Sequence, residues 1–135
     1  MPEQRPIKGF RDLDVYNTGQ KACITVIKEI LPLLPEHEKD DLRDQLSRSC
    51  KAVPRLISEG YGKRHQKRGF QKYLDDAHTE TNETIASIEQ CKNIYNIKPV
   101  LCEQFMDTYD KISRQIYKLA VAWDQFTSAR KILKP

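Results

Sequence analysis

Apolar residues recur every three or four positions in four separate segments of this 135-residue chain. Because an α-helix makes one turn in about 3.6 residues, this spacing gathers the apolar side chains on one face of each helix. The third segment has the most regular stripe, which consists of Phe70, Leu74, Ala77, Thr81, Thr84 or Ile85, Ile88, Cys91 and Tyr95. No useful length of sequence alternates with the period of two that indicates a strand. The pattern therefore predicts an all-α protein.

Turn-forming residues separate the four segments: prolines follow the first and third, and glycines end the second, namely Pro32, Pro35, Gly60, Gly62 and Pro99. The sequence predicts one domain over residues 1–135, with helices at about 12–31, 36–61, 67–95 and 99–127. Since short connections leave consecutive helices as antiparallel neighbours, the expected architecture is an up-down-up-down four-helix bundle. Pro54 removes a backbone hydrogen bond inside the second helix, which predicts a kink or a break there.

The stretch 63–72 carries five Lys or Arg residues and no carboxylate, although the whole chain has a net charge of only +4. In an up-and-down bundle this stretch lies at the same end as residues 1–11 and 127–135. The three segments together carry +10, so the rest of the chain carries −6. Positive charge gathered at one end suggests a polyanion as partner. The candidate nucleic-acid-binding residues are Arg5, Lys8, Arg11, Lys63, Arg64, Lys67, Arg68, Lys72, Arg130 and Lys131.

Aromatic residues flank this cationic stretch and raise the question of base stacking. Tyr61, Phe70 and Tyr73 could stack on the bases of single-stranded RNA. Phe70 and Tyr73, however, fall on the core-facing stripe of the third helix, so we expect them to be core residues first. Contact with phosphates is therefore better supported than the reading of bases. The alternatives are that the charges are merely solvated or that they meet an acidic protein partner.

The sequence lacks the motifs that carry enzymatic chemistry: there is no glycine-rich phosphate loop, nucleophile elbow or paired-carboxylate motif. Di-metal sites in helix bundles require Glu-x-x-His motifs, and none of the three histidines belongs to one. The four cysteines lack Cys-x-x-Cys spacing and lie on or next to apolar stripes; they are Cys23, Cys50, Cys91 and Cys102. We therefore expect a non-enzymatic protein without metal or cofactor, whose cysteines are buried free thiols.

Two observations concern the compartment. No apolar run approaches the roughly 20 residues that are needed to cross a bilayer. The first residues contain no hydrophobic segment that could serve as a secretory signal. We therefore expect a cytoplasmic protein without a membrane partner.

Several strings, taken in order, match the pattern of one protein family. They are Phe10-Arg11-Asp12-Leu13-Asp14-Val15-Tyr16, then Leu42-Arg43-Asp44-Gln45-Leu46-Ser47-Arg48-Ser49, Val53-Pro54 and Ile57-Ser58-Glu59-Gly60-Tyr61-Gly62, and finally Phe70-Gln71-Lys72-Tyr73-Leu74 with Ala77 and Glu83. This series resembles the bacterial four-helix-bundle family encoded in intervening sequences of 23S rRNA genes, over about residues 10–126. The chain departs from the family pattern at Arg55-Leu56 and at Thr79-Glu80.

The resemblance implies a four-helix bundle that assembles into a homopentameric ring. It also implies a relationship to accessory proteins of diversity-generating retroelements, which are thought to bind nucleic acid. Together with the charge pattern, it leads us to expect an oligomeric protein that binds nucleic acid, with RNA favoured over DNA, through phosphate contacts. The alternative hypothesis is a structural or protein-interaction ring with an acidic protein partner.

Overall fold

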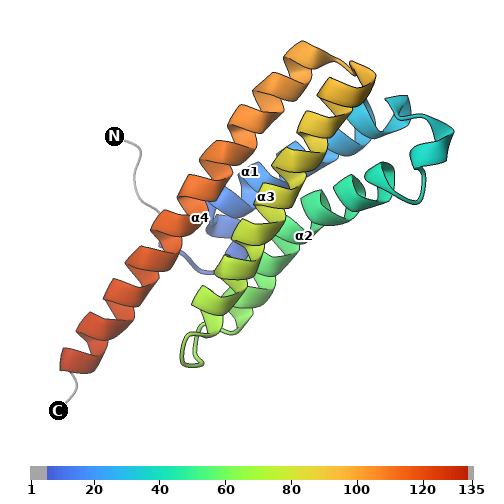
Figure 1. Ribbon diagram of the computed structural model, residues 1–135. Helices are drawn as coiled ribbons and strands as arrows, with labels where there is room; N and C mark the ends of the chain where they lie inside the picture. The colour runs from blue at the N-terminus through green and yellow to red at the C-terminus, as the bar shows by residue number, and fades with distance from the viewer. Residues whose placement is uncertain (1–5, 134–135) are drawn as a thin grey trace.

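The computed structural model describes residues 6–133 of the chain, with side chains up to residue 125. It contains four α-helices, α1 (Asp14–Thr25), α2 (Leu42–Gly62), α3 (Gly69–Tyr95) and α4 (Pro99–Leu133), and residues 6–133 contain no strand. The helices pack alongside one another, and the last turns of α4, in red, extend beyond the other three (Figure 1). None of the helices in the described residues combines the length and apolarity that a membrane span requires. The prediction of an all-α protein with four helices is confirmed.

All four helices contribute to one buried apolar core. Leu46 of α2, Leu74 of α3 and Tyr109 of α4 are among its largest completely buried side chains, and α1 adds Ala22 and Cys23. The α2–α3 and α3–α4 interfaces are the most extensive, whereas the shorter α1 packs against α2 and α4. Burying a large apolar side chain contributes about 1.5–3 kcal/mol. The stripes read from the sequence therefore supply the core that holds the helices together.

The first helix ends earlier than the predicted residue 31. Regular α-helix stops at Thr25, and a π turn (Val26–Ile30) and a 3₁₀ turn (Leu31–Leu33) follow. The N–H of Leu31 donates to the carbonyl of Val26, which closes the wider π turn. Pro32 has no N–H with which to continue the α-helical ladder, so the chain changes its hydrogen-bonding pattern at this point.

The second helix begins later than the predicted residue 36. Glu36–Glu38 forms a separate 3₁₀ turn after Pro35, and α2 starts at Leu42 after the non-helical backbone of Asp41 (φ −124°, ψ −101°). Carboxylates suit either kind of helix start, so charge alone could not separate the two turns. α2 then continues through the buried Pro54 without a break.

Polar contacts join elements that are far apart in the sequence. In the α2–α3 interface the buried hydroxyl of Thr84 donates to that of Ser49 (2.9 Å). Tyr95, at the end of α3, donates its phenolic hydrogen to the carboxylate of Glu38, and this hydrogen bond raises the pKa of Tyr95 to about 12. Lys98 forms an ion pair with Glu29 (2.7 Å). The last two contacts fasten the 26–41 connection to the end of α3 and to the residue before α4.

The cysteines are buried and free, as predicted, at all four positions. A buried thiol behaves as a small apolar group. The cysteines therefore form part of the core.

A close approach between α2 and α3 depends on Gly60. A Cβ atom at this position would lie 2.6 Å from Cβ of Tyr73 and 3.1 Å from Cδ1 of Phe70. Contacts shorter than about 3 Å force the backbone apart. Gly62, two residues later, has nothing within 4 Å of the corresponding position. The two helices therefore meet where α2 lacks a side chain.

We predict that Gly60→Ala destabilises the protein by about 1–3 kcal/mol, because the added methyl group overpacks the α2–α3 contact. The matched control, Gly62→Ala, adds the same methyl group in open space and should leave stability unchanged or raise it by up to about 1 kcal/mol. Urea unfolding followed by circular dichroism measures both. Equal effects of the two substitutions would show that the helices do not meet at Gly60.

Candidate nucleic-acid interface

The connection between α2 and α3, residues 63–68, is a compact loop held by its own backbone. The N–H of Gln66 donates to the carbonyl of Lys63 (3.0 Å), and the N–H of Gly69 donates to the carbonyl of Gln66 (2.9 Å). Arg68 adopts a left-handed conformation (φ 56°), which turns the chain into α3. A Cβ atom at residue 69 would lie 2.0 Å from the Lys63 carbonyl oxygen, so only glycine fits there. The backbone hydrogen bonds and the conformation of Arg68 thus determine the positions from which the loop's side chains project.

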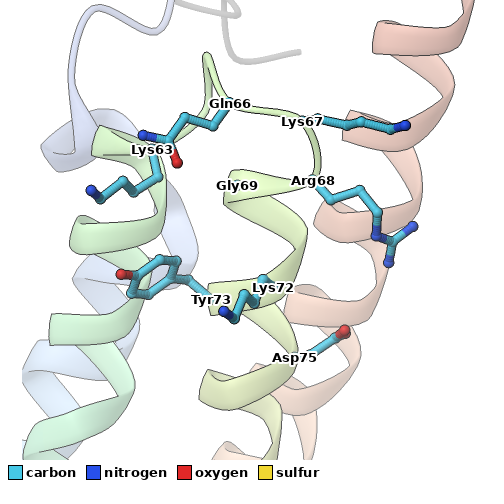
Figure 2. A pocket seen from close by; sticks show the side chains of 8 residues that line it. All are labelled: Lys63, Gln66, Lys67, Arg68, Gly69, Lys72, Tyr73 and Asp75. Atoms are coloured by element: carbon cyan, nitrogen blue, oxygen red, sulfur yellow. The ribbon is translucent and has the colours of Figure 1, made fainter.

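We call the five cations of this region, Lys63, Arg64, Lys67, Arg68 and Lys72, the cationic loop. All except Arg64 are exposed. Figure 2 shows Lys63 on the same side as Tyr73, whereas Lys67 and Arg68 extend to the other side of α3. A hollow of about 540 Å³ lies here, and its lining consists of Lys63, Gln66, Lys67, Arg68, Gly69, Lys72, Tyr73 and Asp75. The loop therefore presents positive charge on both of its sides.

The exposed cations of the loop have no carboxylate partner within the described residues. The ion pairs found there join other side chains, such as Lys92 with Glu103 and Arg114 with Asp110. Asp75 lines the same hollow but forms no ion pair with the loop in the described residues. An exposed cation without a carboxylate partner keeps its full charge for an anion from outside.

Arg64 differs from the other four cations. Its guanidinium carbon lies 4.1 Å from the centre of the Tyr61 ring, and its Nη1 donates to the Tyr61 carbonyl (2.9 Å). A cation over an aromatic face and a hydrogen bond to the last carbonyls of a helix both stabilise the folded chain. Arg64 is therefore partly engaged in capping α2.

Aromatic side chains form the support beneath the loop. Phe70 is completely buried and meets Tyr61 and Trp123 edge to face, with ring centres 5.9 Å and 5.0 Å away. These three rings come from α2, α3 and α4. The prediction that Phe70 is a core residue is correct, while Tyr73 is half-buried and lines the hollow. Tyr61 and Phe70 are thus unavailable for base stacking.

The remaining candidate residues lie outside the loop. Lys8 and Arg11 are exposed in the segment before α1, which lies toward the loop's end of the helices (Figure 1). Asp12 accepts hydrogen bonds from the backbone N–H groups of Lys8 and Gly9 and shapes this segment. Arg5 lies outside the described residues, as do the side chains of Arg130 and Lys131, although α4 continues through both. Their expected convergence with the loop stays a prediction.

Two polar arrangements join pairs of helices outside the cationic loop. Glu80 and Glu83 of α3 line a second hollow, together with Arg48 and Ser49 of α2. Burial, and then the neighbouring Glu83, raise the pKa of Glu80. The hollow therefore brings polar side chains of α2 and α3 together.

The second arrangement joins Ser113 of α4 to His78 of α3, with 2.8 Å between Oγ and Nε2. The serine of a Ser–His pair acts as a nucleophile, with the histidine as its base, when a third group, typically a carboxylate, orients the histidine ring. No such partner of His78 occurs in the described residues. The same residues contain no group of three or more His, Cys, Asp or Glu side chains that could hold a metal ion. We therefore assign this pair an interhelical role.

Comparison with known proteins identifies the family. The family model for the 23S rRNA-intervening sequence protein matches residues 11–118, most of the chain. A search of curated proteins found no significant match. The chain belongs to the 23S rRNA-intervening sequence protein family.

We predict that Arg64→Ala lowers the free energy of unfolding by about 1 kcal/mol, because it removes the contact with the Tyr61 ring and a hydrogen bond. Lys67→Ala should change stability by less than about 0.5 kcal/mol, since Lys67 is exposed and unpaired in the described residues. Chemical unfolding of the two variants checks this difference. If Arg64→Ala were as stable as Lys67→Ala, the capping role of Arg64 would be wrong.

Proposed function

We propose that this member of the 23S rRNA-intervening sequence protein family is a non-enzymatic, cytoplasmic nucleic-acid-binding protein. The observation that carries the proposal is the cationic loop, in which four exposed cations project from a backbone fixed by Gly60 and Gly69. We favour RNA as the partner because the family is named for its link to 23S rRNA.

The side chains of the loop suit phosphates. Lysine offers a compact charge with three donors, and arginine offers a planar fork that matches two phosphate oxygens. Lys63 and Lys67 lie on different sides of the loop, so a strand that crosses it meets cations on both. Each neutralised phosphate releases counterions, which makes such binding sensitive to salt. The buried Phe70 and Tyr61 leave little aromatic surface for bases, and we propose binding without base specificity.

We further propose that the helices run up, down, up and down, and that five copies of the chain assemble into a ring. The short connections at 63–68 and 96–98 support the antiparallel order. Exposed apolar residues of α4, Tyr117 (66% exposed) and Val121 (38%), support a contact between copies. In a parallel ring, five cationic loops would share one face and bind one polyanion together.

If the ring forms, sedimentation equilibrium of the purified protein should give five times the 15.8 kDa mass of one chain. The mass should not depend on nuclease treatment, because the proposed contacts are between protein chains. A single-chain mass at micromolar concentration would contradict the ring and leave the cationic loop as a monomeric site.

We predict that the double variant Lys67→Glu with Arg68→Glu binds an RNA oligonucleotide at least about tenfold more weakly, with a shallower dependence on salt. The matched control, Lys51→Glu with Arg55→Glu, changes the net charge equally at exposed positions of α2 and should lose much less affinity. Fluorescence anisotropy between 50 and 200 mM salt, taken as roughly the range over which phosphate contacts weaken, measures both.

Equal losses in the two double variants would show that only net charge matters. Salt-independent binding would count against phosphate contacts altogether. A pull-down with and without nuclease separates the alternative partner: a protein retained after nuclease treatment would indicate an acidic protein, and loss of all partners would favour nucleic acid.

A further inference from the structure

Two of the buried cysteines touch. The sulfur atoms of Cys23 in α1 and Cys50 in α2 lie 3.5 Å apart, although the residues are 27 positions apart in the sequence. We propose that Cys23 and Cys50 form an oxidative modification site, at which hydrogen peroxide converts the two thiols into a disulfide that links α1 to α2. The inference is independent of the proposed nucleic-acid binding.

The contact has a cause in the packing of the two helices. Gly19 lies one turn before Cys23 on α1, and a Cβ atom there would lie 3.6 Å from Cγ1 of Val53 and 3.8 Å from Cβ of Pro54. Pro54 lies one turn after Cys50 on α2. The helices are therefore in close contact here, at a distance that would also accept a methyl group at residue 19, and the adjacent turns of the same interface hold the two sulfurs. A disulfide requires the sulfurs to approach to about 2.05 Å.

The environment distinguishes the two thiols. The hydrogen bond with Cys50 lowers the pKa of Cys23, and the charge of Lys51 acts in the same direction. The same hydrogen bond, with burial, raises the pKa of Cys50. Cys23 is 5% exposed, whereas Cys50 is completely buried. Cys23 is therefore the thiol that a small oxidant from solvent reaches first.

The reaction balances with hydrogen peroxide as the oxidant. The Cys23 thiolate attacks one peroxide oxygen, the O–O bond breaks, and the departing hydroxide takes up the proton released by the thiol to form water. Cys23 is now a sulfenic acid. The Cys50 sulfur attacks the Cys23 sulfur, the S–O bond breaks, and the departing hydroxide takes up the proton of the Cys50 thiol to leave as a second water. Two thiols are oxidised to one disulfide, and the peroxide is reduced to two waters.

A buried hydroxyl lies near this pair. The Tyr109 hydroxyl, on α4, has no hydrogen-bond partner among the described residues. Its pKa is raised by burial and, to a smaller extent, by the electrostatic influence of Cys50 and Cys23.

The other two cysteines provide an internal comparison. Cys102 directs its thiol to the carbonyl of Ile97 (3.1 Å), and burial raises its pKa. Burial also raises the pKa of Cys91 to about 12. Thiols of this kind react slowly with oxidants. We expect Cys91 and Cys102 to stay reduced under conditions that link Cys23 to Cys50.

The test treats the fully reduced protein with hydrogen peroxide, blocks the remaining thiols with N-ethylmaleimide after unfolding, and maps the peptides by mass spectrometry. The expected result is a Cys23–Cys50 cross-linked peptide, with Cys91 and Cys102 alkylated. Dithiothreitol should reverse the link. Because the link closes a long loop in the unfolded chain, the oxidised protein should also melt roughly 10 °C higher than the reduced protein.

Two sets of variants control the assignment. Cys91→Ser with Cys102→Ser should still form the link, whereas Cys23→Ser or Cys50→Ser should abolish it. If a variant fails to fold, peptide mapping of the peroxide-treated protein without substitutions decides alone. Four alkylated cysteines after peroxide treatment, links that involve Cys91 or Cys102, or a stable higher oxide at Cys23 beside a reduced Cys50 would each overturn the proposal.

Discussion

The close approach of α2 and α3, which is possible because Gly60 and Gly69 have no side chains, is the constraint on which the candidate site depends. At Gly60 the helices meet over Tyr73 and Phe70, and at Gly69 the loop closes against the carbonyl of Lys63. Apolar burial holds the helices together, but these two contacts determine how the chain passes from one to the other. The cations of residues 63–72 project from that passage, so their arrangement follows from backbone packing.

The sequence predicted which residues are buried better than it predicted where the helices begin and end. The helical stripes correctly predicted four helices, the burial of Phe70 and the burial of the four thiols, because the spacing of apolar residues shows which face of a helix is buried. The boundaries near α1 and α2 were predicted less well. The π turn after Thr25 and the late start of α2 depend on local hydrogen bonds and on contacts such as Tyr95 with Glu38, which join distant parts of the chain.

The candidate site, too, could be predicted only in part from the sequence. Composition revealed the run of positive charge, since five cations without an acid stand out in ten residues. Charge counting could not show that Arg64 is held on the Tyr61 ring or that Lys67 and Arg68 extend away from Lys63. The contact between Cys23 and Cys50 was equally invisible, because neither spacing nor periodicity pairs a residue of one helix with a residue of another. Such pairings appear only when the helices are assembled.

Lysine footprinting can show whether the cationic loop is the surface that nucleic acid covers. Acetylation of the native protein with and without an RNA oligonucleotide, read by mass spectrometry, reports each lysine separately. If the cationic loop binds the RNA, Lys63, Lys67 and Lys72 should be protected. The internal controls, which are exposed lysines elsewhere in the described chain, should react as before; they are Lys21, Lys28, Lys39, Lys51 and Lys118. Protection of the controls with full reactivity at Lys63, Lys67 and Lys72 would contradict the account.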